Sequence, residues 1–286
     1  MEIQHYLPGL ICIALALLIM FRLMHYAHFY APSYFFWIGA ILLVMGVISL
    51  IHPLDFIFIS NRTIALGVVL CGIVISVTSL FWPVKMEQSP TTDQQIDGLM
   101  PVYTFNELHE VRIKASPDEV KEVFRVTGVN DIPVVHLLMK IRGIADEDVD
   151  LSDRASSNKA GTDTFTTPDF NFFVVAPDEY IAVMILKPAM ISGDKGKPAP
   201  PEISSIEQFN AFNEPGYMKV AINFRIIGTN NNDTLLTTET RVDGTTKADS
   251  YAFGHYWRVV YPGSAIIRRV WLDTIKKKAE QKIKRI

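Results

Sequence analysis

Charged side chains are almost absent from residues 1–84, and this limits what the chain can fold into. Only Glu2, Arg22, Asp55 and Arg62 precede Lys85, although the whole chain carries 27 Lys and Arg and 30 Asp and Glu. The net charge of -3 and the hydrophobic content of 49% are therefore averages over two different kinds of sequence. This partition excludes a purely soluble enzyme, a disordered chain and a nucleic-acid binder whose affinity rests on overall basicity.

Three apolar stretches in this region have the length of membrane-spanning helices. A helix needs about 20 mostly apolar residues to cross the hydrocarbon core, where every backbone N–H and C=O must be satisfied internally. The sequence predicts such helices over residues 7–24, 34–51 and 64–82, within a transmembrane region that covers residues 1–84. A cleaved signal peptide is the alternative for the first stretch, but no Lys or Arg precedes it and no small-residue cleavage site follows.

The few charges that border these stretches indicate an orientation. Three crossings place Arg22 and Lys85 on one side of the bilayer and Arg62 on the other. Because cytoplasmic loops carry an excess of Lys and Arg, the C-terminal part is predicted to lie in the cytoplasm. Cys12 and Cys71 both fall within apolar stretches, so the soluble part has neither a disulfide nor a cysteine-ligated metal site, which favours the reducing side.

The sequence after residue 84 predicts a linker followed by an α+β domain. Residues 85–104 are mostly polar, turn-rich and without period, as in a linker. Ser116, Pro117 and Glu119 combine an N-cap, a proline in the first turn and a capping-box acid, so a short helix begins here. Within the domain, residues 105–286, we predict strands over 106–115, 170–175, 180–186, 217–228 and 233–244, and helices over 116–124, 132–141 and from 249 onward, the last kinked or interrupted at Pro262 and Gly263.

The strands over 217–228 and 233–244 form the best-patterned hairpin in the chain. One face is expected to be a charged outer face, on which symmetric closure pairs Lys219 with Asp243, Ala221 with Arg241 and Asn223 with Glu239. The other face is apolar but dotted with hydroxyl groups, and it sets Met218, Val220, Ile222, Phe224 and Ile226 against Val242, Thr240, Thr238 and Leu236. Such a wall is typical of a ligand cavity and equally of a packed core, and both remain open.

Three blocks of this region resemble a known family. They are FNEPGYMKVAINFRI (212–226), LLTTETRV (235–242) and FGHYWRVVYPGSAIIRRVWLDTIKKKAE (253–280), with support from VRIKASPDEV (111–120). With the element order, they are similar to the START-like (SRPBCC, helix-grip) superfamily, in particular to uncharacterised bacterial members. The resemblance implies a curved antiparallel sheet that grips a long C-terminal helix around a cavity, which in relatives holds lipids, sterols, quinones, polyketides or other apolar molecules. Fusion to membrane helices departs from the usual stand-alone domain.

The candidate ligand contacts come from the hydroxyl-dotted face, the closing helix and one histidine. They are Met218, Val220, Ile222, Phe224, Thr238, Thr240, Phe253, Tyr256, Trp257 and His136. We interpret His136 as a core or rim residue rather than a catalytic base, and Glu239 and Arg241 as a structural pair rather than a ligand contact. Residues 146–153 lack the glycine and the bidentate glutamate of a calcium loop. No catalytic residue, metal site or cofactor is therefore predicted.

The end of the chain is strongly basic. From Arg258 onward there are nine Lys and Arg against two acidic residues. Six of these cations are candidates to hold the domain against an anionic membrane surface, namely Lys276, Lys277, Lys278, Lys282, Lys284 and Arg285. The alternative is a solvated helix end whose cations complement the helix macrodipole.

These observations and the resemblance predict an integral membrane protein of the bacterial inner membrane with a cytoplasmic C-terminal domain. The leading hypothesis is a membrane-anchored binding protein for a hydrophobic small molecule or lipid, acting at the bilayer surface. The first alternative is an interaction or assembly module that has a membrane protein partner and no ligand. The third is a cyclase- or hydratase-like enzyme. The expected partners are the bilayer and an apolar molecule, and no nucleic acid.

Overall fold

The computed structural model describes residues 3–26, 30–89, 94–127, 164–166, 171–187, 200–201, 203–229 and 233–283. The chain forms two compact units. The helical unit consists of Met1–Pro83 and Gly254–Pro262, and the sheet unit of Val84–Phe253 and Gly263–Ile286. Several predicted features lie outside the described residues, namely the helix over 132–141 with His136, the acidic run over 146–153, Lys284 and Arg285.

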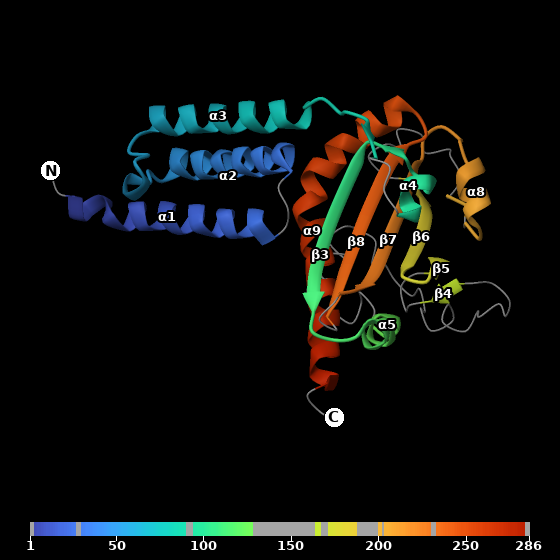
Figure 1. Cartoon of the computed structure of the whole chain (residues 1–286). Coiled ribbons are helices and arrows are strands. Elements are labelled where there is room, and N and C mark those ends of the chain that lie inside the picture. The colour runs from blue at the N-terminus through green and yellow to red at the C-terminus, as the bar shows by residue number, and fades with distance from the viewer. Residues whose placement is uncertain are drawn as a thin grey trace, which may run out of the picture. The chain divides into compact units, whose positions relative to one another are not determined.

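The helical unit contains α1 (Ile3–Tyr26), α2 (Ala31–Ile51), the short 3-10 helix η1 (Asp55–Ile57) and α3 (Arg62–Leu80) (Figure 1). By length and composition, α2 and α3 are apolar enough to cross a membrane. In α1 the described residues give an apolar stretch over Gly9–Arg22, which is shorter than the roughly 20 residues that a crossing needs. Within the described residues there are thus two candidate spans, and the predicted number of three is corrected to two.

Small residues form the contact between α2 and α3. Gly39 and Gly46 of α2 and Ala65 and Gly72 of α3 are all buried, and each pair is spaced seven residues apart. A Cβ added at Gly72 would lie 2.5 Å from the backbone nitrogen of Leu43. The large apolar side chains point away from this contact and are exposed, among them Ile41, Val44, Leu70 and Val74. A pair of helices that buries its small residues and exposes its large apolar ones is typical of a lipid environment.

A segment of the C-terminal helix, residues 254–262, completes the helical unit. The fully buried Arg258 donates from Nη1 to the Leu80 carbonyl at 2.7 Å and from Nη2 to the Trp82 carbonyl. Nδ1 of His255 lies 2.8 Å from the same Leu80 carbonyl and must carry the proton, because a carbonyl only accepts. These donors satisfy carbonyls at the C-terminal end of α3, where the helix macrodipole favours positive charge.

The sheet unit is an α+β fold built on one antiparallel sheet of six strands in the order β3-β8-β7-β6-β5-β4. A separate two-stranded sheet pairs β1 with β2. Ser116 forms the predicted capping box with Glu119 at the start of α5. The elements are β1 (Glu87–Gln88), α4 (Gln95–Leu99), β2 (Val102–Tyr103), β3 (Phe105–Ile113), α5 (Pro117–Arg125), β4 (Thr164–Thr166), β5 (Asn171–Ala176), β6 (Glu179–Leu186), α8 (Ile206–Ala211), β7 (Met218–Gly228), β8 (Thr234–Gly244) and α9 (Lys247–Ile283).

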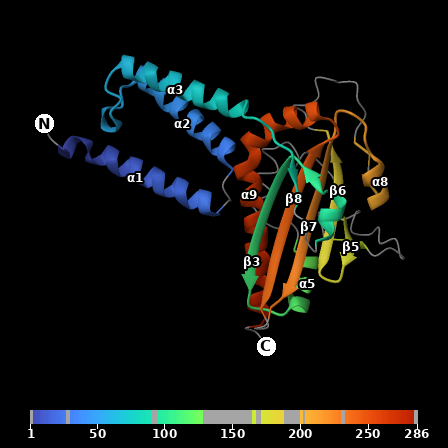
Figure 2. The ribbon, with the colours of Figure 1, turned by 45° about the horizontal axis from the view of Figure 1, so that its top comes forward.

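One face of the sheet, which we call the helix face, packs against α9 and α5 (Figure 2). Phe224 of β7 lies with its ring centroid 4.8 Å from Phe124 of α5 and 4.8 Å from Trp271 of α9. At the start of β3, the ring centroid of Phe105 lies 5.3 Å from that of Phe253 of α9. Aromatic contacts therefore anchor the helix face at two places along the sheet.

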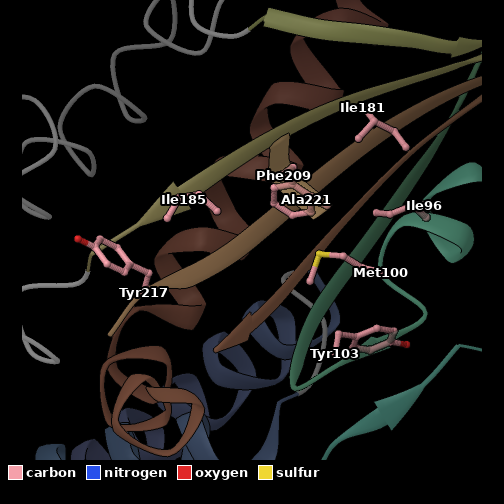
Figure 3. Close-up of a cluster of buried hydrophobic side chains, with 8 residues drawn as sticks. All are labelled: Ile96, Met100, Tyr103, Ile181, Ile185, Phe209, Tyr217 and Ala221. Carbon is pink, nitrogen blue, oxygen red and sulfur yellow. The ribbon is translucent and has the colours of Figure 1, made fainter. Parts of the chain in front are cut away.

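The opposite face, which we call the outer face, is also covered. Figure 3 shows its apolar cluster, which comes from α4, β2, β6, β7, α8 and residues next to them. Its members are Ile96, Met100, Tyr103, Ile181, Ile185, Phe209, Tyr217 and Ala221. The sequence predicts a linker over residues 85–104, whereas the structure places β1, α4 and β2 there and packs α4 on the sheet. The middle of the outer face is consequently buried on β6, β7 and β8, whereas the sequence predicted a charged outer face.

The helix α9 runs without interruption through Pro262, and it bends before it follows the sheet (Figures 1 and 2). Proline has no N–H, so the carbonyl of Arg258, four residues earlier, loses its helical partner. The hydroxyl of Ser33 in α2 donates to this carbonyl at 2.6 Å. The next carbonyl, of Val259, accepts from the indole nitrogen of Trp37 at 3.1 Å. Of the two predicted outcomes, a kink or an interruption, the interruption is absent, and Ser33 of α2 supplies the donor that the Arg258 carbonyl lacks.

Replacing Ser33 by Ala is expected to lower the free energy of unfolding by about 1–3 kcal/mol, because the buried Arg258 carbonyl loses its donor. The loss should shrink when Pro262 is also replaced by Ala, since residue 262 then supplies an N–H. The measurement is a double-mutant cycle of thermal or denaturant unfolding on the full chain in detergent. Ser49→Ala is the matched control, because Ser49 donates to the carbonyl of Met45 within its own helix. An additive cycle would contradict this account of Pro262.

Candidate functional site

Two clusters of buried polar side chains lie on opposite faces of the sheet, and they differ in how well their hydrogen bonds are satisfied. The outer cluster consists of Asp97, Glu179, Asn223, Glu239 and Arg241. The inner cluster, on the helix face, consists of Glu107, His109, Thr238 and Thr240. Burial of polar groups without partners is unfavourable, so the state of each cluster bears on its role.

The outer cluster holds α4 on the sheet by both of its ends. Glu179 accepts from the backbone N–H of Gln95 at 2.9 Å, at the N-terminus of the helix. Arg241 donates to the carbonyl of Met100 at 2.9 Å, just beyond the C-terminus. An acid at the start and a cation at the end both complement the helix macrodipole. The outer cluster therefore fixes the position of the α4 segment.

Hydrogen bonds also join the members of the outer cluster to one another. Arg241 donates to Glu239 at 2.7 Å and to Asp97 at 2.5 Å, while Asn223 donates to Glu179 at 2.9 Å. Burial acts to lower the pKa of Arg241, but the hydrogen bonds and charges of Glu239 and Asp97 raise it above its ordinary value. Within the described residues, Oδ2 of Asp97 is the one side-chain N or O atom of the outer cluster that is buried without a partner. This network is a structural one.

The hairpin register behind this cluster is as predicted. The structure pairs Lys219 with Asp243, Ala221 with Arg241 and Asn223 with Glu239. The expected solvent exposure is wrong, because α4 covers the middle of this face and buries the Arg241 side chain. The predicted structural role of Glu239 and Arg241 agrees with these contacts.

The inner cluster brings an acid and a base together on the helix face. Glu107 and His109 are 2% and 1% exposed, and Nε2 of His109 lies 2.7 Å from Oε1 of Glu107. On the neighbouring strand, Thr240 pairs with Glu107 and Thr238 pairs with His109. Directly opposite residues share one face of a sheet, so the four side chains form a compact polar block.

The cross-strand pairs Glu107–Thr240 and His109–Thr238 each begin a row across the sheet. Both rows continue with apolar side chains on β7 and β6. Beyond Thr240 the next strand presents Ile222, and beyond Thr238 it presents Phe224, which in turn pairs with Tyr180 of β6. Burial raises the pKa of the Tyr180 phenol, as expected in apolar surroundings. The middle of the helix face is thus polar on β3 and β8 and apolar on β7 and β6.

Three oxygens of the inner cluster are buried without a hydrogen-bond partner in the described part of the chain. They are Oε2 of Glu107, Oγ1 of Thr238 and Oγ1 of Thr240. An unsatisfied buried polar group costs about 1–3 kcal/mol. Such groups are uncommon in folded proteins, and each one calls for an explanation such as a functional role. The inner cluster is therefore the candidate functional site.

Sequence reasoning pointed to Thr238 and Thr240 and missed Glu107 and His109. The signal was present in the strand FNELHEVRI, where the two residues share the parity of Phe105, Val111 and Ile113. All the residues at these alternate positions are buried, while the residues between them are exposed. Polar residues at core positions of an alternating strand are the pattern that would have found them.

The other predicted ligand contacts divide between the two units. Met218, Val220, Ile222, Phe224 and Phe253 are buried in the sheet unit together with both threonines. Trp257, which is buried, and Tyr256, which is half-buried, lie in the segment of α9 that belongs to the helical unit. The structure therefore assembles part of the predicted set on the helix face.

The basic residues near the end of α9 make contacts within the sheet unit. Lys276 donates to the Arg112 carbonyl at 2.6 Å and to Glu280 at 2.8 Å. Lys278 donates to Thr127, and Lys282 pairs with Glu122 of α5 at 2.5 Å. These contacts fasten the end of α9 to β3, to α5 and to the residues that follow α5. Lys277 is exposed.

Comparison of the chain with protein-family models, with curated proteins and with solved structures gives no match in any of the three searches. Among the residues described by the structure, no group of three or more His, Cys, Asp or Glu is placed to hold a metal ion. Function must therefore be inferred from the inner cluster and its surroundings.

Proposed function

We propose that the protein is a membrane-anchored binding protein for an apolar molecule, whose polar group is held by the inner cluster. The observation that carries this proposal is the set of three buried oxygens without described partners, on Glu107, Thr238 and Thr240. They lie beside the apolar side chains of Ile222 and Phe224 on the same face. An apolar wall with a few placed polar groups is the usual lining of a small-molecule site.

The helical unit supports the membrane part of this proposal. Its helices α2 and α3 are long enough to cross a bilayer and expose their large side chains. We propose a cytoplasmic sheet unit, because Lys85 and Arg258 lie at the end of α3 that leads into it and Arg62 lies at the other end. The order β3, α5, antiparallel strands and α9 supports the proposed relation to the START-like, helix-grip superfamily.

A binding experiment on the full chain tests the proposal. The protein is purified in lipid nanodiscs, and small molecules that remain bound are identified by native mass spectrometry and by extraction. We expect a discrete apolar species that is reduced in the variant Thr238→Val with Thr240→Val. Thr237→Val is the matched control, because Thr237 alternates with these residues and faces the other side of β8. A wild-type protein that carries and takes up no apolar molecule would refute the proposal.

In that case, crosslinking that recovers one membrane protein would favour the alternative of an interaction or assembly module.

The Glu107–His109 pair favours an acid–base enzyme as a second candidate function. A carboxylate that orients a histidine by a 2.7 Å hydrogen bond is a common arrangement for moving a proton. An enzyme of the cyclase or hydratase kind would convert the bound molecule to a product. His109→Gln should then abolish this conversion and retain binding, which distinguishes an enzyme from a binding protein.

A further inference from the structure

We infer that the molecule held by the inner cluster carries an uncharged hydroxyl group, and that the site selects against carboxylates and phosphates. This inference rests on the proposed binding function. It follows from which hydrogen bonds the unsatisfied atoms are able to make, and from the charges that surround them.

Oε2 of Glu107 needs a donor. A proton must lie between Oε1 of Glu107 and Nε2 of His109 at their separation of 2.7 Å. Whichever of the two atoms holds this proton, Oε2 of the same carboxyl group is left as an acceptor. A ligand group that satisfies Oε2 must therefore carry an O–H or N–H.

The two threonine hydroxyls need partners that complement them. Each Oγ1 is able to donate one hydrogen bond and to accept others, so Thr238 and Thr240 match a ligand oxygen that also does both. Thr240 is the cross-strand neighbour of Glu107, and its hydroxyl is buried. A ligand hydroxyl placed here donates to Glu107 and accepts from a threonine, which satisfies both kinds of atom.

An anionic head group has the wrong charge for this place. A carboxylate or fully ionised phosphate offers no donor to Oε2 of Glu107, and burial of its negative charge among the buried side chains of the inner cluster is strongly unfavourable at low dielectric. The nearby arginine of the sheet, Arg241, cannot compensate, because it lies on the outer face and is bound to Glu239 and Asp97. Ile222 and Phe224 flank the inner cluster on the same face, and they are the apolar side chains that a hydrocarbon part of the ligand would contact.

Three probes of equal chain length test this selectivity: 1-hexadecanol, hexadecanoic acid and hexadecyl methyl ether. Binding of each to the full chain in nanodiscs is measured by competition with a fluorescent apolar probe, with empty nanodiscs as blank. We expect the alcohol to bind about tenfold more tightly than the ether, the ratio for one lost hydrogen bond, and to exceed the acid by at least as much.

Two variants assign the selectivity to the inner cluster. Glu107→Gln replaces the carboxylate by an amide that also donates, so the preference for alcohol over acid should fall severalfold. Glu110→Gln is the matched control, because Glu110 is exposed on the same strand. If Glu107→Gln does not fold, Thr240→Val removes one hydroxyl without changing shape and should lower the alcohol-to-ether ratio.

The outcomes separate the two proposals. Binding of the acid as tightly as the alcohol, or an unchanged preference in Glu107→Gln and Thr240→Val, would overturn the inferred hydroxyl selectivity and leave apolar binding intact. Failure of all three probes to displace the fluorescent probe, together with no uptake of that probe, would refute the binding function itself.

Discussion

Replacing Arg241 by Met is expected to lower the free energy of unfolding of the sheet unit by about 3–5 kcal/mol, the range for breaking a buried ion pair from one side. The substitution leaves Glu239 and Asp97 buried without their cation. It also removes the donor to the carbonyl of Met100 that holds the end of α4. Denaturant unfolding of the full chain in detergent, followed by tryptophan fluorescence, measures the loss.

Two further variants make this prediction specific. Arg112→Met is the matched control, an arginine on an exposed position of β3, and should change stability by less than about 0.5 kcal/mol. Neutralising the acids together with the arginine, in Arg241→Met with Glu239→Gln and Asp97→Asn, should recover a large part of the loss, because no buried charge is then left alone. Equal effects of Arg241→Met and Arg112→Met would show that the outer cluster does not hold α4.

Replacing Gly72 by Leu is expected to destabilise the α2–α3 pair by about 3 kcal/mol, at the upper end for overpacking. The first added atom would already lie 2.5 Å from the backbone nitrogen of Leu43 and 2.8 Å from the carbonyl oxygen of Gly39. Backbone atoms of a packed helix cannot turn aside as a flexible side chain does, so the two helices must separate. Thermal unfolding in detergent and protease sensitivity of the connection between the helices report this separation.

The chain contains its own control for this prediction. Gly67 lies in the same helix, and a Cβ added there meets nothing within 4 Å. Gly67→Leu should therefore leave the helix pair intact, and it adds the same apolar volume on an exposed face. If both variants behave alike, the close approach of α2 and α3 is not what stabilises the pair.

The strand pairing could be predicted from the sequence, but the burial of the outer face could not. Alternation along residues 217–228 and 233–244 and a short turn determine which residues pair, and Asn223 indeed lies opposite Glu239. Burial of that face depends on α4, a helix of five residues inside a polar, turn-rich segment. Such a helix is stabilised by Glu179 and Arg241 rather than by its own sequence, so local patterns do not reveal it.

Only half of the candidate site could be predicted from the sequence, because local patterns again reveal some of its residues and not others. Thr238 and Thr240 stand out because they interrupt an apolar face. Glu107 and His109 lie in a strand whose exposed positions are also mostly polar, so their place at buried positions is visible only when parity is followed from Phe105 to Ile113. The Arg258 carbonyl, which Pro262 leaves without its helical partner, accepts from Ser33, a residue 225 positions earlier that no local pattern contains.

The division of α9 between the two units has a consequence for how the protein is made. The chain emerges from the ribosome N-terminus first, so α2 and α3 are synthesised long before residues 254–262. Until those residues arrive, the carbonyls of Leu80 and Trp82 lack the Arg258 guanidinium, and the sheet lacks the helix that covers its inner side. Synthesis of the last helix thus completes both parts together, and a chain that stops before it exposes two incomplete surfaces to cellular quality control.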